Sequence, residues 1–334
     1  MLRFLKNWTL PVAIVVGIGL YLLFALTPQL DATGDRLEPI IERLLPATIF
    51  LTLFVTFSKV DFQKMRLRRW HGWVFMAQLL LIGIVLAAIL FIDETNAAEG
   101  SSSLAMADMT IRKQLLEVVL ICIIAPCAAA SPVVTGKLGG DVTQMTTFVL
   151  TSSVVTSLLM SAVFPIIEPH AGATFTAAFL AILERLASVL LLPLVLGAVV
   201  RHQVQPLYHW FVHTPDLGFY LWSISLAMTA GLTMRNIVHS HTASHLFDAI
   251  ALLSLAAAIA QLIIGRLIGK VTGEHICTGQ GMFQKNTGLA IWIALVYLTP
   301  EASIGAGCYV LWQNIINSYE LWQHRRSGAP SVSR

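Results

Sequence analysis

The stretch Gln284-Lys285-Asn286-Thr287-Gly288 lies inside an apolar run, residues 276–298, that is long enough to cross a bilayer. Polar groups and a full charge at membrane depth are costly unless protein or water surrounds them. Lys285 has at least nine residues of the run on either side, so its ammonium cannot easily reach the membrane surface. A lysine in this setting predicts a functional site. The alternative is a structural ion pair, for which the candidate carboxylates are Glu42, Glu117 and Glu184.

A second apolar run is interrupted by Pro126-Cys127-Ala128-Ala129-Ala130-Ser131-Pro132. Each proline lacks an N–H group and clashes with the carbonyl four residues earlier, so the pair should open the backbone over several residues. The freed backbone groups, with the hydroxyls of Ser131 and Thr135, could then hold an ion or a polar substrate. A simple kink with close packing of small residues is the alternative. Two broken spans in one chain are typical of a secondary transporter with its site at mid-membrane.

The composition indicates an all-α membrane protein. Of 334 residues, 56% are hydrophobic and 12% are charged, whereas a soluble globular protein carries about 25% charged residues. The net charge of +3 gives no reason to expect nucleic acid as a partner. The four cysteines form no CxxC pair, so no metal site is expected. No span carries paired carboxylates or a metal-ligand cluster, so the chain is not expected to be an enzyme.

Apolar stretches of roughly 20 residues predict ten transmembrane helices, at residues 8–27, 38–57, 71–92, 112–136, 142–165, 175–200, 216–235, 246–269, 276–298 and 302–323. Lys and Arg occur at the N-terminus, in alternate connections and in the short tail 324–334, whereas the connection 93–111 contains none. The positive-inside rule then places both termini in the cytoplasm. The expected location is a bacterial inner membrane.

An internal repeat is weakly visible. Residues 77–83, Ala-Gln-Leu-Leu-Leu-Ile-Gly, resemble residues 260–265, Ala-Gln-Leu-Ile-Ile-Gly, and in both cases the next span is a broken one. Residues 8–165 and 175–323 would then be two inverted repeats of five helices. We expect the fourth and ninth helices to be discontinuous and to cross, within a core of spans 3–5 and 8–10 beside a panel of the other four. Chance recurrence of such strings in apolar sequence is the alternative.

At the two breaks the chain resembles the bile acid:sodium symporter family. Cys127, residues 130–135 and the turn at 139–141 follow the family's fourth-span pattern, and residues 281–290 follow its ninth-span pattern with two extra positions. Gln78 matches a glutamine that family members use as a sodium ligand. Residues 193–197 resemble a further family motif, P-L-x-x-G.

The departures from the family pattern concern the sodium sites. Pro132 stands where the family has asparagine, and Lys285 stands where it has glutamine. The ninth-span glutamate that bridges both sodium sites falls on Gly279 or Gly281. Because sodium needs hard oxygen ligands, the loss of that carboxylate together with the gain of an ammonium at Lys285 favours a branch with weak or absent sodium coupling.

These observations predict a secondary active transporter of a small organic anion that works by alternating access. No cofactor is expected; sodium or a proton is the candidate coupling ion, and a homodimer is left open. The alternatives are a true sodium symporter and, in a different class, a membrane sensor or scaffold that transports nothing. The candidate site residues, which line or flank the breaks, are Gln78, Ser131, Pro132, Thr135, Thr147, Thr151, Gln261, Gln284, Lys285, Asn286 and Thr287.

Overall fold

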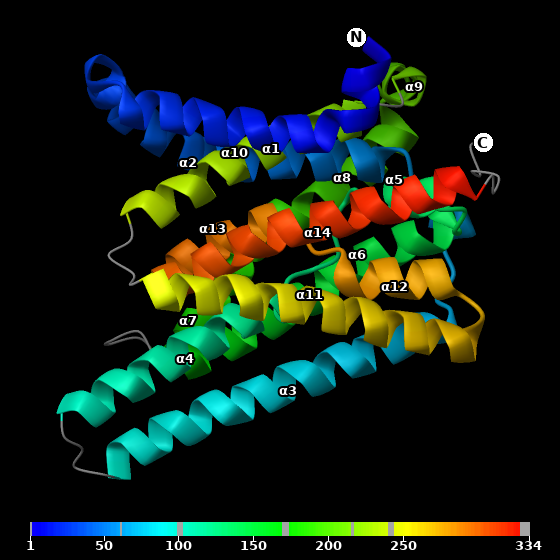
Figure 1. Ribbon diagram of the computed structural model, residues 1–334. Helices are drawn as coiled ribbons and strands as arrows, with labels where there is room; N and C mark the ends of the chain where they lie inside the picture. Colours follow the sequence, from blue (N-terminus) through cyan, green and yellow to red (C-terminus); the bar gives the residue numbers. More distant parts are fainter. Residues whose placement is uncertain are drawn as a thin grey trace.

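The computed structural model describes residues 2–60, 62–98, 103–168, 174–214, 217–239 and 244–327. These residues form helices and connections, with no β-strand among them (Figure 1). The chain is therefore all-α, as its composition predicts. The helices up to the predicted repeat boundary are α1 (Leu2–Leu26), α2 (Pro28–Ser58), the short 3₁₀ helix η1 (Phe62–Lys64), α3 (Arg69–Ala98), α4 (Ser103–Ile124), α5 (Ser131–Lys137) and α6 (Val142–Ile167).

The second part of the chain begins with a helical stretch in which one turn is π-helical and the rest is α-helical. A π-helical turn, η2 (Ala187–Leu191), joins α7 (Phe175–Leu186) to α8 (Leu192–Gln203). The remaining helices are α9 (Gln205–His213), α10 (Leu217–His239), α11 (Ser244–Thr272), α12 (His275–Phe283), α13 (Thr287–Tyr297) and α14 (Pro300–Arg326).

Several helical stretches have the length and composition of membrane spans. Five of them are apolar over more than 18 residues: Pro39–Ser58, Arg69–Thr95, Val142–Ile167, Phe175–Gln203 and Leu246–Thr272. Their outward faces carry large apolar side chains, such as Leu80, Phe91 and Val271. Apolar side chains on the outside of a helix suit lipid rather than water. The fold is that of an integral membrane protein.

The helices form two packed groups (Figure 1). In one group α1, α2, α8 and α10 pack against one another; in the other, α3, α4, α11, α12 and α14 do. The four helices of the first group fall within the predicted panel, whereas α7, the first half of the predicted sixth span, packs on α6. Gly17 allows the close packing of α1 on α10, because a Cβ at this position would collide with the carbonyl of Ala227. The two groups meet where α10 packs on α13 and α14.

The structure corrects some predicted boundaries. The connection predicted at residues 93–111 is largely helical, since α3 continues to Ala98 and α4 already begins at Ser103. The helix predicted at 38–57 begins ten positions earlier, at Pro28, a residue that suits the first turn of a helix. Polar residues can extend a helix beyond the bilayer because water satisfies its backbone there, so hydropathy alone underestimates helix length.

Candidate functional site

The two predicted breaks are present, and they meet. The chain is non-helical at residues 125–130, between α4 and α5, and at 284–286, between α12 and α13. Cys127 and Lys285 pair as an antiparallel β-bridge. On either side of this pair, the Ala128 N–H donates to the Gln284 carbonyl at 2.9 Å and the Asn286 N–H donates to the Pro126 carbonyl at 2.8 Å. The discontinuity of both helices is thus confirmed, and each break satisfies backbone groups of the other.

Polar side chains satisfy further backbone groups at the ends of the broken helices. The Gln78 amide donates to the Ile123 carbonyl at 2.9 Å, and the Gln261 amide donates to the Cys122 carbonyl at 3.2 Å, both at the end of α4. The Tyr309 hydroxyl donates to the Phe283 carbonyl, at the end of α12, at 2.7 Å. An unpaired carbonyl in a dry interior is costly. These side chains therefore hold the breaks open, with the two glutamines bound to protein carbonyls.

Two more side chains hold the break residues themselves. The Lys285 N–H donates to Gln313 Oε1 at 2.7 Å, and Gln313 Nε2 donates to the Lys285 carbonyl at 3.3 Å. The Cys127 N–H donates to the Ser152 hydroxyl at 2.9 Å. Sequence reasoning missed Gln313 and Ser152. The signal for Gln313 was a third amide beside Asn314 and Asn317 in an otherwise membrane-like helix.

Lys285 is buried, and it has no ionic partner among the residues that the structure describes. Its residue is 2% exposed, and within the part of the chain that the structure describes no ion pair or hydrogen bond joins its ammonium. Of the three carboxylates considered as partners, Glu184 is exposed and Glu117 is bound to Thr299. The Glu42 side chain lies outside the described residues. The ionisable groups that interact electrostatically with the ammonium are the thiols of Cys127 and Cys122.

A small cavity reaches Lys285 from the side of α2 and α10. It measures about 30 Å³, enough for a few waters at most. Asn286 caps α13 here, accepting from the Leu289 N–H at 3.3 Å. The cavity is lined by Ile49, Thr52, Leu53, Ala128, Ala129, Trp222, Ser225, Leu226, Thr229, Lys285, Asn286, Thr287 and Gly288.

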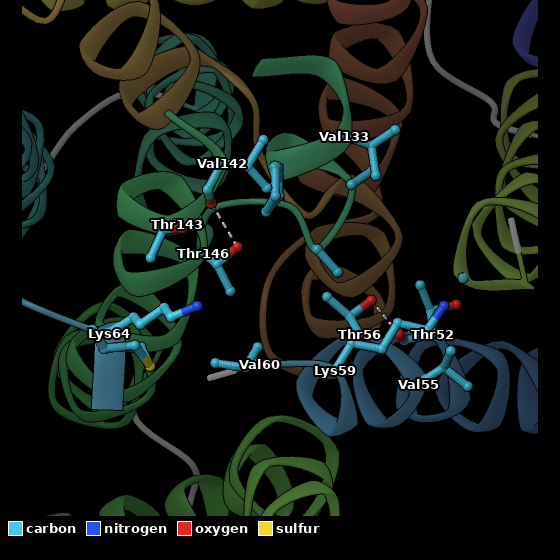
Figure 2. A pocket seen from close by; sticks show the side chains of 15 residues that line it. Thr52, Val55, Thr56, Lys59, Val60, Lys64, Val133, Val142, Thr143 and Thr146 are labelled. Atoms are coloured by element: carbon cyan, nitrogen blue, oxygen red, sulfur yellow. Dashed lines mark hydrogen bonds between the residues drawn. The ribbon is translucent and has the colours of Figure 1, made fainter. Parts of the chain in front are cut away.

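A larger cavity, which we call the vestibule, adjoins the first and shares Thr52 and Ala129 with it. It measures about 340 Å³. Figure 2 shows Lys64 extending into it from one side, opposite Thr52 and Thr56 of α2. Lys59 also lines it and donates to the Thr214 carbonyl at 2.9 Å. The full lining is Thr52, Val55, Thr56, Lys59, Val60, Lys64, Met65, Ala129, Ala130, Pro132, Val133, Val142, Thr143, Thr146 and Gly218.

The other predicted site residues are divided between the break and its surroundings. Ser131 is buried and accepts from the Cys127 thiol at 3.1 Å, while Pro132 occupies the first turn of α5 and lines the vestibule. Thr147 and Thr151 donate to carbonyls of their own helix, α6. The fully buried polar side-chain atoms of Thr135 and Gln284 find no hydrogen-bond partner among the described residues.

The structure also shows why glycine occupies both positions where the bridging glutamate could fall. A Cβ at Gly281 would lie 3.2 Å from the Phe148 ring and 3.3 Å from the Trp70 ring. At Gly279 it would lie 2.8 Å from Nε of Arg266. Trp70 and Phe148 pack with ring centroids 5.2 Å apart. Side chains from α3, α6 and α11 thus fill the space that a carboxylate would need.

Two broken helices whose breaks pair inside an all-α membrane protein, with a buried lysine at the pairing, are typical of secondary transporters. The chain matches the model of the sodium bile acid symporter family over residues 47–240. It belongs to this family, a family of transporters. The match covers the first break and ends before the second, where Lys285 lies. No curated protein matches the chain.

Proposed function

We propose that this protein is a secondary active transporter of a small organic anion, with Lys285 as the fixed positive charge that binds it. The single observation behind this proposal is the burial of an ammonium group that has no ionic partner among the described residues. A buried charge without a partner is strongly destabilising. A bound anion would offset that penalty, so a buried ammonium favours a negatively charged ligand.

The location of the two cavities supports alternating access. Both lie between α2, of the first helix group, and the break residues, of the second. In the proposed mechanism, ten transmembrane helices form two inverted repeats, residues 8–165 and 175–323. The core with the crossed breaks rocks against the panel, the group of α1, α2, α8 and α10. Rocking of one group against the other around a fixed site would expose the anion to each side in turn.

The vestibule supports the choice of an anionic substrate. Lys59 and Lys64 lie in the most basic connection of the chain, and both line the vestibule. Lysines around a cleft raise the local concentration of anions and speed their association. The positive-inside rule assigns this basic side to the cytoplasm. In our proposal the structure is therefore the inward-facing state, both termini are cytoplasmic, and the membrane is a bacterial inner membrane.

We propose that sodium coupling is weak or absent. Rings or a guanidinium occupy the space beside Gly281 and Gly279, the two positions where the family's bridging carboxylate could fall. A sodium ion about 4 Å from the Lys285 ammonium would be repelled by roughly 4 kcal/mol at an effective dielectric of 20. That repulsion is comparable to the whole binding energy of a ligand with a dissociation constant of about 1 mM.

The test uses purified protein and a panel of small carboxylates and sulfonates. Binding is measured by thermal shift and uptake is measured in liposomes, with sodium or potassium as the cation. We expect at least one anion to stabilise the wild type and not Lys285→Ala, with Lys270→Ala, at the exposed end of α11, as the matched control. Saturable sodium stimulation would favour the symporter. A chain that binds anions without uptake would favour the sensor or scaffold.

A further inference from the structure

A third cavity adjoins the vestibule, between the connection that joins α2 to α3 and the first turns of α6. It measures about 70 Å³, more than twice the volume of the small cavity at Lys285. Two of its residues, Lys64 and Thr143, also line the vestibule, and Figure 2 shows their side chains on the same side of it. The full lining is Lys64, Arg66, Arg68, Asp141, Thr143, Gln144 and Thr147.

Positive charge dominates this cavity. Three cationic side chains line it together with a single carboxylate, that of Asp141. Among the described residues, the guanidinium groups of Arg66 and Arg68 take part in no ion pair or hydrogen bond. Like charges that share a small cavity repel one another. An anion with two negative charges would offset this repulsion.

The carboxylate of Asp141 is engaged by its own helix. Its Oδ1 accepts from the Gln144 N–H at 3.0 Å, and its Oδ2 accepts from the Gln144 side-chain amide at 3.0 Å. That amide also donates to Glu274 at 3.4 Å, and its oxygen accepts from the Trp70 indole N–H at 2.7 Å. The polar atoms of Asp141 and Gln144 are therefore used within the protein.

The donors that the described residues leave unused are the guanidinium groups of Arg66 and Arg68 and the Thr143 hydroxyl. A guanidinium presents its N–H groups in a fixed fork that matches two oxygens of a phosphate or a carboxylate. Two such forks and a hydroxyl, with the charge of Lys64 beside them, suit a group with several oxygens and two charges. A phosphate has this chemistry, whereas a carboxylate has two oxygens and one charge.

The surroundings of the cavity resemble the level of lipid head groups. Leu67, between the two arginines in the chain, is 71% exposed, and Trp73 near the start of α3 is also exposed. An exposed tryptophan beside basic residues is typical of the membrane–water interface. Basic pockets between transmembrane helices bind the phosphates of lipid head groups. An anionic lipid and a soluble phosphate compound are therefore the two sources of this chemistry.

We propose that this cavity binds a phosphate group through Arg66, Arg68 and Thr143. The connection 59–68 is the covalent link between α2 of the panel and α3 of the core. A phosphate held by its arginines and by Thr143 ties this connection to α6, and it lies against Lys64, which the vestibule shares. Bound phosphate should therefore restrict the rocking of the core against the panel and lower uptake; this regulation rests on the proposed transport function.

Thermal shift of the purified protein in a neutral detergent tests the site without any substrate. Potassium phosphate is compared with potassium chloride at equal ionic strength and pH. We expect phosphate to raise the Tm of the wild type saturably, with a dissociation constant about tenfold weaker in Arg66→Gln/Arg68→Gln, because charge-assisted hydrogen bonds are lost. Arg69→Gln, an exposed arginine outside the cavity lining, should match the wild type. Equal responses to the two salts, or equal weakening in Arg69→Gln, overturns the site.

A second double variant, Arg66→Lys/Arg68→Lys, separates the guanidinium forks from the net charge. It keeps both charges, so its general attraction for anions should be that of the wild type. Its dissociation constant for phosphate should still be several-fold weaker, because an ammonium offers no fork. An affinity equal to that of the wild type overturns recognition by the two arginines.

Native mass spectrometry distinguishes the two sources of phosphate. Phosphatidic acid or phosphatidylcholine is added to the protein in detergent. Retention of phosphatidic acid that inorganic phosphate displaces, and that Arg66→Gln/Arg68→Gln loses, assigns the site to a lipid head group. Equal lipid retention in wild type and variant, together with the thermal shift by phosphate, assigns it to a soluble phosphate compound.

Uptake measures the regulation separately. Liposomes that contain the protein are given an anion that the wild type transports, with potassium phosphate or potassium chloride on the side of the basic connections. We expect phosphate to lower uptake by the wild type and by Arg69→Gln, and to leave Arg66→Gln/Arg68→Gln unaffected. Inhibition that persists in this double variant means that phosphate acts elsewhere, and it overturns the regulation. If no anion is transported, the proposed function fails, whereas the thermal shift still decides on the phosphate site.

Discussion

The side-chain amide of Gln313 hydrogen-bonds both backbone polar groups of Lys285, the N–H and the carbonyl. Its Oε1 accepts from the Lys285 N–H at 2.7 Å and its Nε2 donates to the Lys285 carbonyl at 3.3 Å. This is the pairing that an adjacent β-strand would provide. Cys127 faces Lys285 across the β-bridge, whose hydrogen bonds join the flanking residues, so one break and α14 together fix the backbone at Lys285.

Removal of the Gln313 amide should loosen Lys285 without removing its charge. We expect Gln313→Ala to lower the free energy of unfolding by about 1–3 kcal/mol, because two buried backbone groups lose a partner. In transport, the KM for the anion should rise more than the maximal rate falls. Gln323→Ala is the matched control: its amide bonds Tyr319 on the exposed part of α14, and the change should be small. An unchanged KM in Gln313→Ala would contradict a positioning role.

Replacement of Lys285 by a neutral residue should make the protein more stable. Lys285→Met keeps the length of the side chain and removes a buried, unpartnered charge, so the free energy of unfolding should rise by about 1 kcal/mol or more. Anion binding should be lost at the same time. Lys285→Arg keeps the charge but should transport poorly, because the guanidinium is larger, planar and differently hydrated.

Lys270→Met, on the exposed end of α11, controls for a general effect of removing a lysine. The opposite result would be informative. If Lys285→Ala destabilises the protein, and removal of a carboxylate restores both stability and transport, then Lys285 is half of a structural ion pair.

Sodium should have little effect on stability or uptake. We expect equal melting temperatures in sodium and potassium chloride at the same ionic strength. Gly281→Glu should not create sodium dependence. Its side chain would press against the rings of Phe148 and Trp70. Overpacking of this kind lowers the free energy of unfolding by about 1–3 kcal/mol. Gly83→Ala provides a control, since a Cβ at Gly83 meets open space. A sodium-dependent rise in melting temperature that saturates would refute the prediction.

The charge of Lys64 should increase the rate at which the anion associates with the vestibule. Lys64→Gln should lower the uptake rate at low substrate concentration by up to about tenfold at low ionic strength, as expected for electrostatic steering. The difference should shrink as salt is added, because exposed charges are screened over about 10 Å at 0.1 M. Lys137→Gln, at the exposed end of α5 and not in the vestibule lining, is the control. A rate deficit that does not depend on salt would indicate a structural defect.

The membrane orientation can be tested with a reporter fused after Arg326. We expect a cytoplasmic readout, because the basic connections and both termini lie on one side in the ten-span topology. A second fusion after Ala98, at the end of α3, should read out on the opposite side. A periplasmic signal after Arg326 would contradict the ten-span topology.

The sequence pattern was enough to predict where the two helices break. It was not enough to predict which side chains contact the breaks. Two prolines and a polar run flanked by glycines interrupt helices for local reasons, so residues 125–130 and 284–286 could be predicted. The partners of Gln78 and Gln313 depend on which helix lies opposite, and no local pattern encodes that. Gln78 was singled out by its match to a family motif, and its hydrogen bond to the Ile123 carbonyl on another helix was not foreseen. Lys59 and Lys64 were interpreted only as markers of orientation, because their place in the vestibule depends on how α2 faces α5 and α6 across that cavity.

The burial of Cys122, Cys127, Cys277 and Cys308 has a practical consequence. Water-soluble maleimides and methanethiosulfonates need contact with a thiolate, which these positions do not offer in the state described. The natural protein should therefore serve directly as a silent background for labelling. A single cysteine placed at Thr56 or Thr143 would report solvent access to the vestibule. Loss of labelling there during turnover, with native thiols still protected, would follow the movement between states without a cysteine-free variant.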